Sequence, residues 1–303
     1  MLFRSLAALG DPRFDPERWH LPRGQDLGFV AVPAQDSYAL GTRPADAQRV
    51  RQAVGRDPKA SELNDWPVQI AAFHIAQYPV TVAQYRAFVN DTGYTVGDAD
   101  ALLDPDTRPV QYVSWDDAQA YCHWLTRQLR HSSAVAGLPA ALGVRQHGWR
   151  VDLASEAEWE CAARAGQVGA VYPWGDSADA EAANFRESGI GNSSAVGCFA
   201  SNPWRLYDMV GNLWEWTRSA WRDSYRDPDL TDSMQSQDAD VSRPVRGGSW
   251  FFSRDIARCA VRTELFPDGR SMVTFRVVLR SSLDLPPGAE PTRRSAPRRR
   301  SGL

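Results

Sequence analysis

Residues 243–279 constrain the fold of this chain more than any other stretch. They pass through a tight Gly247-Gly248 turn to Trp250 and end in the alternating run Phe275-Arg276-Val277-Val278-Leu279. Alternation of this kind predicts a β-strand. Four arginines in the stretch lie next to apolar residues: Arg246, Arg258, Arg262 and Arg276. We expect them to pair with buried carboxylates, which fixes the geometry of loops more than it adds stability.

The composition allows a large core. With 303 residues, 43% of them hydrophobic, the chain can form one sizeable domain or two small ones. Its formal net charge of −3 gives the bulk surface no electrostatic reason to bind DNA or RNA, so no nucleic-acid partner is expected. No window approaches about 18 uninterrupted apolar residues, so no membrane segment is expected.

Cysteine and histidine are scattered along the chain. The four cysteines contain no CxxC pair and the five histidines no HExxH pair, so neither residue type predicts a metal site. Residues 1–10 are too short and too quickly polar for a signal peptide. We therefore interpret the cysteines as buried thiols in a reducing compartment and expect a cytoplasmic protein.

Capping residues predict about three helices, and alternation predicts several strands. The helices are expected over 82–92 after Thr81, over 115–129 after Ser114, and from 156 after Ser155. The strands are expected at 68–78, 149–153 and 275–279, with a hairpin entry over 28–40. Residues 42–64 are polar and charged, and we interpret them as a surface excursion.

Three parts are predicted along the chain. Residues 1–27 are broken by prolines and are expected to strap onto a main domain that spans 28–282. Residues 283–303 are rich in proline, arginine and serine, so they are predicted to form a disordered basic tail. Between Asp176 and Pro244 helix and strand signals are sparse, which favours loops packed on a small sheet and pinned by ions or tryptophans.

Seven segments resemble the formylglycine-generating enzyme family, and they occur in family order over roughly residues 28–280. They are PVTVAQYRAFV, PVQYVSWDDAQAYCHWL, WRVDLASEAEWECAARAG, YPWGD, LYDMVGNLWEWT, RPVRGGSW and FRVV. The resemblance implies a variant of the C-type lectin fold: an α+β, loop-rich domain with small antiparallel sheets. One early segment departs from the family pattern, because this chain reads AQDSYALG where a glycine-rich turn is usual.

The family's oxidase activity depends on a pair of cysteines after the GGS motif, which bind copper(I) and activate oxygen. Soft thiolates are the ligands that copper(I) prefers. Between Gly248 and Arg258 this chain has no cysteine, and Cys259 matches a family cysteine outside the pair. Related sulfoxide synthases use iron held by histidines of an added helical domain, for which this chain has no counterpart. We therefore predict a protein that is not an enzyme and requires no cofactor.

A second resemblance is to the variable proteins of diversity-generating retroelements, which use the same fold. They display altered residues near the C-terminus on a constant frame, because adenines in asparagine codons of a template repeat are mutated. Here the segments RGGSW, ARCA and FRVV match such a frame. The intervening positions, except Met272, can be reached from an AAC codon by changing its two adenines.

This second resemblance implies a ligand-binding surface near the C-terminus. The predicted positions are Trp250, Phe251, Phe252, Ser253, Ile256, Val261, Thr263, Leu265, Phe266, Gly269, Ser271, Met272 and Val273. Many of them are apolar residues in a loop that would normally be polar, which is typical of a displayed binding surface. The partner would be an unknown protein or small molecule.

Other interpretations of the same residues stay open. Loops of this fold are half-buried, so Phe251, Phe252, Ile256 and Leu265 can instead belong to the core. The codon argument is permissive, since AAC reaches fifteen amino acids by those changes. The chain can equally be a constant ligand-binding domain, of the kind found at the C-terminal end of larger bacterial signalling proteins. The alternative enzyme is a copper- and oxygen-dependent oxidase that makes formylglycine.

Calcium is the one ion that the resemblance suggests. Asn184, Asn212 and Glu215 match family positions near bound calcium, and oxygen donors on loops suit Ca²⁺. The alternative is that Asn212 caps a turn and Glu215 pairs with an arginine such as Arg246. The acid pairs Asp116-Asp117 and Glu156/Glu158 lie in first helical turns, where acids favour the helix dipole, so general acid–base chemistry is the lesser interpretation.

Overall fold

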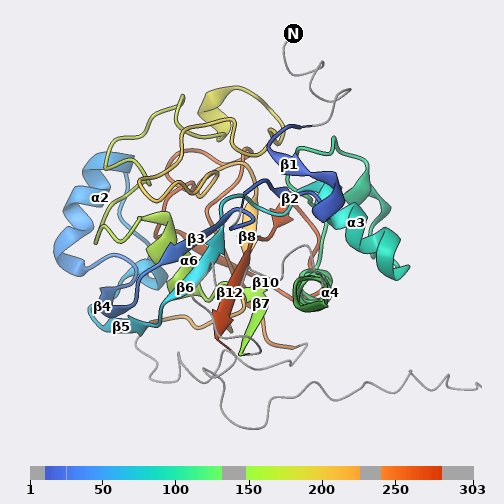
Figure 1. Cartoon of the computed structure of the whole chain (residues 1–303). Helices are drawn as coiled ribbons and strands as arrows, with labels where there is room; N and C mark the ends of the chain where they lie inside the picture. The colour runs from blue at the N-terminus through green and yellow to red at the C-terminus, as the bar shows by residue number, and fades with distance from the viewer. Residues whose placement is uncertain (1–10, 25, 132–147, 226–239, 282–303) are drawn as a thin grey trace, which may run out of the picture.

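The strand predicted over 275–279 lies at the centre of the main sheet, shifted to residues 277–281. The computed structural model describes residues 11–24, 26–131, 148–225 and 240–281. In it β12 (Val277–Ser281) pairs antiparallel with β7 (Trp149–Leu153) on one side and with β6 (Phe73–Ala76) on the other. β3 (Phe29–Val32) completes the order β3-β6-β12-β7. Figure 1 shows β12 between β6 and β7.

A second four-stranded sheet contains three strands from the stretch that opened the sequence analysis. Its order is β10 (Arg262–Leu265), β9 (Arg243–Arg246), β8 (Trp214–Trp216) and β11 (Val273–Thr274). The first two pairings are antiparallel, whereas β11 and β8 run parallel over two residues. The predicted small antiparallel sheets are confirmed, apart from this two-residue parallel pairing.

The remaining strands form two-stranded ladders. β1 (Phe14–Asp15) pairs with β2 (Leu21–Pro22), and β4 (Gln35–Ala39) pairs with β5 (Pro67–Ile70). The strand predicted over 68–78 is thus two strands in different ladders. The hairpin expected over 28–40 is also divided, because β3 pairs with β6 and β4 pairs with β5.

Four α-helices lie in the described residues: α2 (Ala47–Val54), α3 (Val82–Thr92), α4 (Trp115–His131) and α6 (Glu156–Ala163). The three predicted helices are confirmed, and Thr81 and Ser155 form the capping boxes of α3 and α6. α2 was missed inside the expected surface excursion. Its sequence is mostly polar, and only Val50 and Val54 are buried, four residues apart on one face.

Short 3₁₀ turns connect these elements: η1 (Pro16–Arg18), η2 (Pro44–Asp46), η3 (Ala60–Glu62), η4 (Ala99–Leu102) and η6 (Arg186–Ser188). Much of the remaining chain is loop, as predicted for the region after Asp176. None of the helices in the described ranges is both long and apolar enough to cross a membrane.

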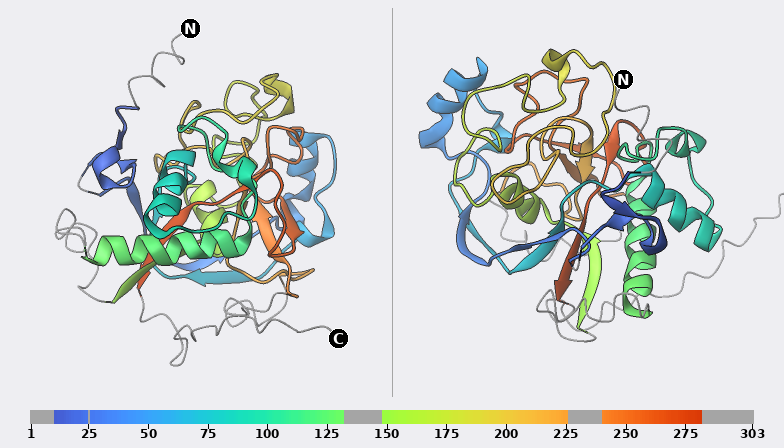
Figure 2. Two further views of the ribbon diagram at one scale, coloured as in Figure 1. Left: turned by 90° about the vertical axis from the view of Figure 1, so that its right-hand side faces the viewer. Right: turned by 45° about the horizontal axis from the view of Figure 1, so that its top comes forward.

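Aromatic side chains fill the core between α3, α4 and the main sheet. Tyr85, Phe88, Tyr121 and Trp124 form tilted and edge-to-face pairs, and Phe275 closes the cluster from the strand side. α4 packs along β7, and Figure 2 shows the helix lying beside that strand. These contacts fix α4 relative to the C-terminal end of the domain.

The segment before β3 also contacts this core. Leu21 and Leu27 are buried in it, and the Trp19 ring meets the Trp124 ring edge-on. The boundaries 1–27, 28–282 and 283–303 stay predictions. The basic tail and the first ten residues lie outside the described residues.

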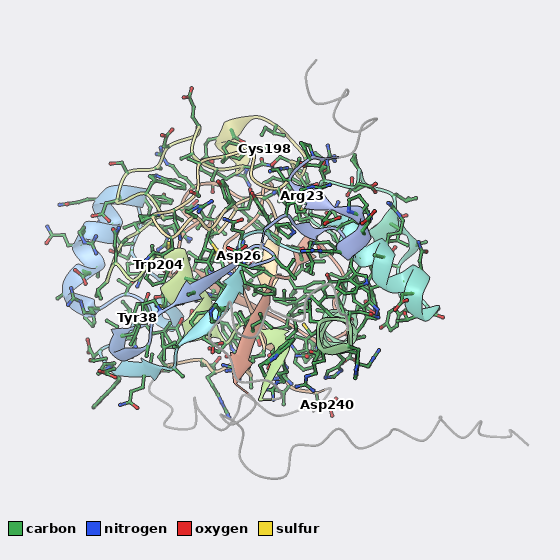
Figure 3. The ribbon with its side chains drawn as sticks, in the orientation of Figure 1. Arg23, Asp26, Tyr38, Cys198, Trp204 and Asp240 are labelled. Carbon is green, nitrogen blue, oxygen red and sulfur yellow. The ribbon has the colours of Figure 1, made fainter. Side chains whose placement is uncertain are left out.

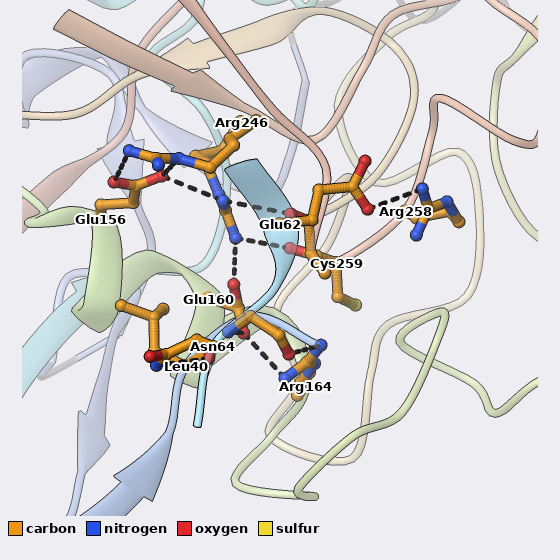
Figure 4. Close-up of polar contacts among 12 residues, drawn as sticks. Leu40, Glu62, Asn64, Glu156, Glu160, Arg164, Arg246, Arg258 and Cys259 are labelled. Atoms are coloured by element: carbon orange, nitrogen blue, oxygen red, sulfur yellow. Dashed lines mark hydrogen bonds and ion pairs between the residues drawn. The ribbon is translucent and has the colours of Figure 1, made fainter. Parts of the chain in front are cut away.

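Buried ion pairs join α6 to the second sheet. Arg246, on β9, contacts the Glu156 carboxylate at 3.0 Å and also pairs with Glu160. Arg262, on β10, donates two hydrogen bonds to Glu156, at 2.6 and 2.8 Å. Arg164 pairs with Glu160 at 2.7 Å. Figure 4 shows this network converging on α6.

The other two predicted arginines are also paired. Arg276 donates to both oxygens of Glu215, at 2.7 and 2.8 Å, and Arg258 contacts Glu62 at 2.8 Å. All four guanidinium groups and their acids are almost fully buried. The expectation that these arginines pair with buried carboxylates is confirmed.

Substitution Glu156→Gln removes the charge that Arg246 and Arg262 share. We expect unfolding free energy to fall by about 3–5 kcal/mol, since a buried charge left without its partner is strongly destabilising. Urea denaturation followed by circular dichroism measures the change.

The matched control is Asp57→Asn, which breaks the exposed pair with Arg51 at 3.8 Å. It should change stability by about 0.5 kcal/mol or less. Equal effects of the two substitutions would contradict the role given to Glu156.

Candidate ligand-binding site

An apolar pocket of about 290 Å³ opens on one face of the second sheet. Strand residues point alternately to opposite faces, so Thr263 and Leu265 of β10 share a face. Val245 lies directly opposite Thr263, and Trp214 lies opposite Val273. These five side chains form the floor of the pocket, and residues from the loops on either side of the sheet complete its walls.

Eight of the thirteen predicted ligand-binding residues line this pocket: Phe252, Ile256, Val261, Thr263, Leu265, Ser271, Met272 and Val273. They come from positions spread over 22 residues of sequence. Trp214 of β8 donates a backbone hydrogen bond to Met272 at 3.1 Å, which holds the end of this segment against the second sheet.

The eight residues differ in burial. Val261 and Val273 are 1% and 0% exposed, so they belong to the core and present only the base of the pocket. Phe252, Ile256 and Leu265 are partly buried and pack against that core. Each of these three side chains therefore packs against the core on one side and faces the pocket on the other. The core and the ligand-binding interpretations both apply to them.

The other five predicted residues lie outside the pocket lining. Phe251 and Phe266 are 51% and 61% exposed. Trp250 is half-buried, and its backbone N–H donates to Asn212 at 3.0 Å. Ser253 bonds to Asp255 through its hydroxyl, and Gly269 closes a turn onto Phe266. The structure does not bring these five together around one cavity.

Gly248 fixes how the loop enters this region. Its φ of +77° belongs to the left-handed region, and an added Cβ would lie 2.8 Å from the Ala257 Cα atom. Only glycine fits both conditions. The close approach folds residues 249–257 back over the sheet, which places Phe252 and Ile256 at the pocket wall.

Five of the lining residues were outside the predicted ligand-binding set: Lys59, Trp214, Val245, Arg262 and Glu264. Lys59 lies just before η3, in the stretch interpreted as a surface excursion. Ion pairs hold that stretch near the site, because Arg56 contacts Asp255 at 2.7 Å and Glu62 contacts Arg258. A local sequence pattern does not reveal a contact across nearly 200 residues; the Arg258–Glu62 separation is 196.

The three predicted calcium ligands are divided between two places. Asn184 and Asn212 are adjacent, since the Asn212 backbone N–H donates to the Asn184 carbonyl at 2.6 Å. Glu215 instead has both oxygens engaged by Arg276, and one of them also accepts from the Trp159 indole at 2.7 Å. The arrangement does not fit a set that includes Glu215 as a Ca²⁺ ligand, because its charge is already neutralised.

A calcium site at the two asparagines stays a prediction. Their side-chain oxygens accept from Ser188 and from the Ser194 backbone N–H. Within the described ranges, no three His, Cys, Asp or Glu side chains gather in a metal-binding group. For Glu215 the ion-pair alternative is confirmed, with Arg276 as the partner in place of Arg246.

The acid pairs noted in the sequence are engaged in structural contacts. Glu156 pairs with Arg246 and Arg262, and one Glu158 oxygen accepts a hydrogen bond from the Ser155 backbone N–H at 2.6 Å. Asp117 accepts from the Ser114 backbone at 2.8 Å and from the Tyr94 hydroxyl at 2.7 Å. These contacts leave Asp117, Glu156 and Glu158 poorly suited to proton transfer.

Three of the four cysteines are buried thiols. Cys122, Cys161 and Cys259 lie in the core, and burial raises the pKa of both Cys161 and Cys259 to about 12. Thiols with such a pKa are protonated at neutral pH and are poor metal ligands. Cys198 is exposed, on the loop labelled near the upper edge of the molecule in Figure 3.

Comparison with known proteins identifies the family and the fold. Residues 41–281 match the family described as the sulfatase-modifying factor enzyme 1-like domain, and the chain belongs to that family. The fold is the C-type lectin-like fold of that family, as the sequence predicted.

A curated relative and two solved structures are similar over most of the chain. The bovine (Bos taurus) protein named inactive C-alpha-formylglycine-generating enzyme 2 is 33% identical over 334 residues, covering 89% of this chain and 94% of the relative. PvdO from Pseudomonas aeruginosa superimposes with a TM-score of 0.63 at 26% identity, covering 83% of this chain and 93% of PvdO. Treponema denticola variable protein 1 gives a TM-score of 0.59 at 20% identity, with 82% and 94% covered, and shows the fold alone.

Thiol titration tests the placement of the cysteines. In the native protein a thiol reagent such as Ellman's reagent should react rapidly with one thiol, Cys198, and in denaturant with all four. The buried three are shielded and protonated. The Cys198→Ser variant should show no rapid reaction. A second rapidly reacting thiol would contradict this placement, because it would mean that one of the three core cysteines is accessible and reactive.

Proposed function

We propose that this protein is a non-catalytic ligand-binding domain whose site is the pocket on the second sheet. One observation carries the proposal: eight positions singled out as a binding surface surround a single apolar pocket. Pockets for small ligands are concave and mostly apolar, with few polar groups. The ligand class is an apolar small molecule or an apolar side chain of a protein partner.

Several features support a non-catalytic role. The segment from Gly248 to Arg258 contains no cysteine, so the thiol pair required for copper(I) is missing from its family position. The buried thiols that remain have a raised pKa. A relative that is 33% identical carries the name inactive, which is compatible with this proposal. We propose no required cofactor, and the core thiols suit a reducing, cytoplasmic compartment.

The finer hypothesis is that the pocket is diversified, as in the variable protein of a retroelement. The pocket-facing positions lie between the segments RGGSW, ARCA and FRVV, whose arginines form buried ion pairs. The pocket-facing residues can therefore vary while these segments keep their structure. Val261 and Val273 are buried and would tolerate less variation. Genomic DNA next to the coding sequence should then contain a near-copy of its 3′ end and a reverse transcriptase gene. Their absence would favour a constant sensor domain.

The alternative function, formylglycine formation, predicts turnover. Incubation with copper(I), oxygen and a cysteine-containing sulfatase peptide should leave the peptide mass unchanged if the proposal holds. Conversion of the peptide would overturn the non-catalytic role.

The pocket itself is tested with a neutral apolar fluorescent probe, N-phenyl-1-naphthylamine. Substitution Leu265→Asn replaces an apolar wall by an amide and should weaken probe binding at least about tenfold, the loss expected for part of an apolar side-chain contact. Fluorescence titration measures the dissociation constant.

The matched control is Leu103→Asn, at a leucine that is 75% exposed and outside the pocket lining. It should leave probe binding unchanged. Circular dichroism of both variants checks that the fold is retained. Equal probe binding by wild type and Leu265→Asn would contradict the proposed site.

A further inference from the structure

The charged residues around the pocket indicate what kind of apolar ligand it takes. Three of the residues that line it carry a formal charge: Lys59, Arg262 and Glu264. A charge that is already paired contributes little to binding, whereas an unpaired one at an apolar site selects the ligand. The partners of these three residues therefore decide the question.

The charge of Arg262 is neutralised on the opposite face of the sheet. Its guanidinium donates two hydrogen bonds to Glu156 and lies 4.1 Å from the ring centre of Trp221. Arg262 is 1% exposed. Because Arg262 alternates with Thr263 along β10, its side chain points away from the pocket floor.

Glu264 follows the same alternation. It lies two residues after Arg262 on the same strand, so its side chain is directed to the same face as Arg262. Its carboxylate accepts a hydrogen bond from the Ser242 hydroxyl. Glu264 is exposed and pairs with no cation among the described residues, but alternation directs its carboxylate to the face opposite the pocket floor, as it does the Arg262 guanidinium.

Lys59 is the charge that remains. It is the one lysine in the chain and is exposed. In the described part of the chain no carboxylate lies within 4.0 Å of its ammonium group. The Arg56–Asp255 and Arg258–Glu62 pairs, on either side of Lys59 in sequence, hold its loop against the pocket wall.

We propose that the pocket binds a small apolar carboxylic acid, with its apolar body on Trp214, Thr263 and Leu265 and its carboxylate paired with Lys59. This inference rests on the proposed function and specifies its ligand class. The apolar floor favours a ring or short hydrocarbon chain. Lys59, which has no carboxylate partner among the described residues, favours a ligand with one negative charge. A volume of about 290 Å³ lies at the lower end of ligand pockets, which are about 300–1,000 Å³, and suits a compact acid.

The experiment compares two probes of the same shape, 2-naphthylacetate and its neutral amide, 2-naphthylacetamide. In isothermal titration calorimetry at low ionic strength, the acid should bind about three- to fivefold more tightly than the amide. This is the range expected for an exposed ion pair. The preference should shrink as salt is added, because the pair is screened.

Variants at Lys59 test whether this residue causes the preference for the acid over the amide. Lys59→Met should bring the acid-to-amide ratio to about one without weakening the amide, and Lys59→Arg should keep the preference. The matched control is Arg127→Met, an exposed cation on α4, which should leave both affinities unchanged. Lys59 is exposed, so its substitution leaves the fold intact, as circular dichroism will check.

The outcomes separate the two proposals. Equal binding of acid and amide by the wild type, with both lost in Leu265→Asn, would overturn the carboxylate inference and leave the pocket function standing. A preference that persists in Lys59→Met would also overturn it. Binding of neither probe by the wild type would contradict the pocket proposal itself.

Discussion

Buried pairing between arginines and carboxylates is the interaction on which the rest of this structure depends. Glu156 and Glu160 on α6 receive Arg246 and Arg262 from two adjacent strands, and Glu215 receives Arg276. Such pairs contribute little net stability compared with an apolar core, but they cannot be separated without leaving a buried charge. In a domain with so much loop, they specify which strand lies against which helix.

The same strands that carry the ion pairs also carry the proposed binding surface. On β10, Arg262 points to α6, whereas Thr263 and Leu265 point to the pocket. One face therefore holds the fold and the other faces the pocket of the proposed ligand site. The ion pairs at α6 and Glu215 join arginines to carboxylates, so this frame does not depend on the thiol pair of the family's oxidase.

Sequence reasoning predicted the parts of this structure that have local signals. Capping residues predicted the starts of α3, α4 and α6. Arginines that alternate with apolar residues predicted pairing with buried carboxylates. α2 was missed because two buried valines in a polar helix give a weak periodicity. Lys59 was missed because long-range ion pairs, Arg56–Asp255 and Arg258–Glu62, bring its loop to the site. The segment that lines most of the pocket was identified, but not the division between buried Val273 and exposed Phe266, which depends on how the turn folds over the sheet.

The central claim is that the ion-paired frame is independent of the residues that face the pocket. A crystal structure of the double variant Phe252→Ser/Leu265→Ser tests it most directly. The account predicts an unchanged backbone over residues 243–281, with Arg246 and Arg262 still bound to Glu156 and only the pocket enlarged. A rearranged loop in which these arginines have lost Glu156 would show that frame and pocket are one unit, and would contradict the account.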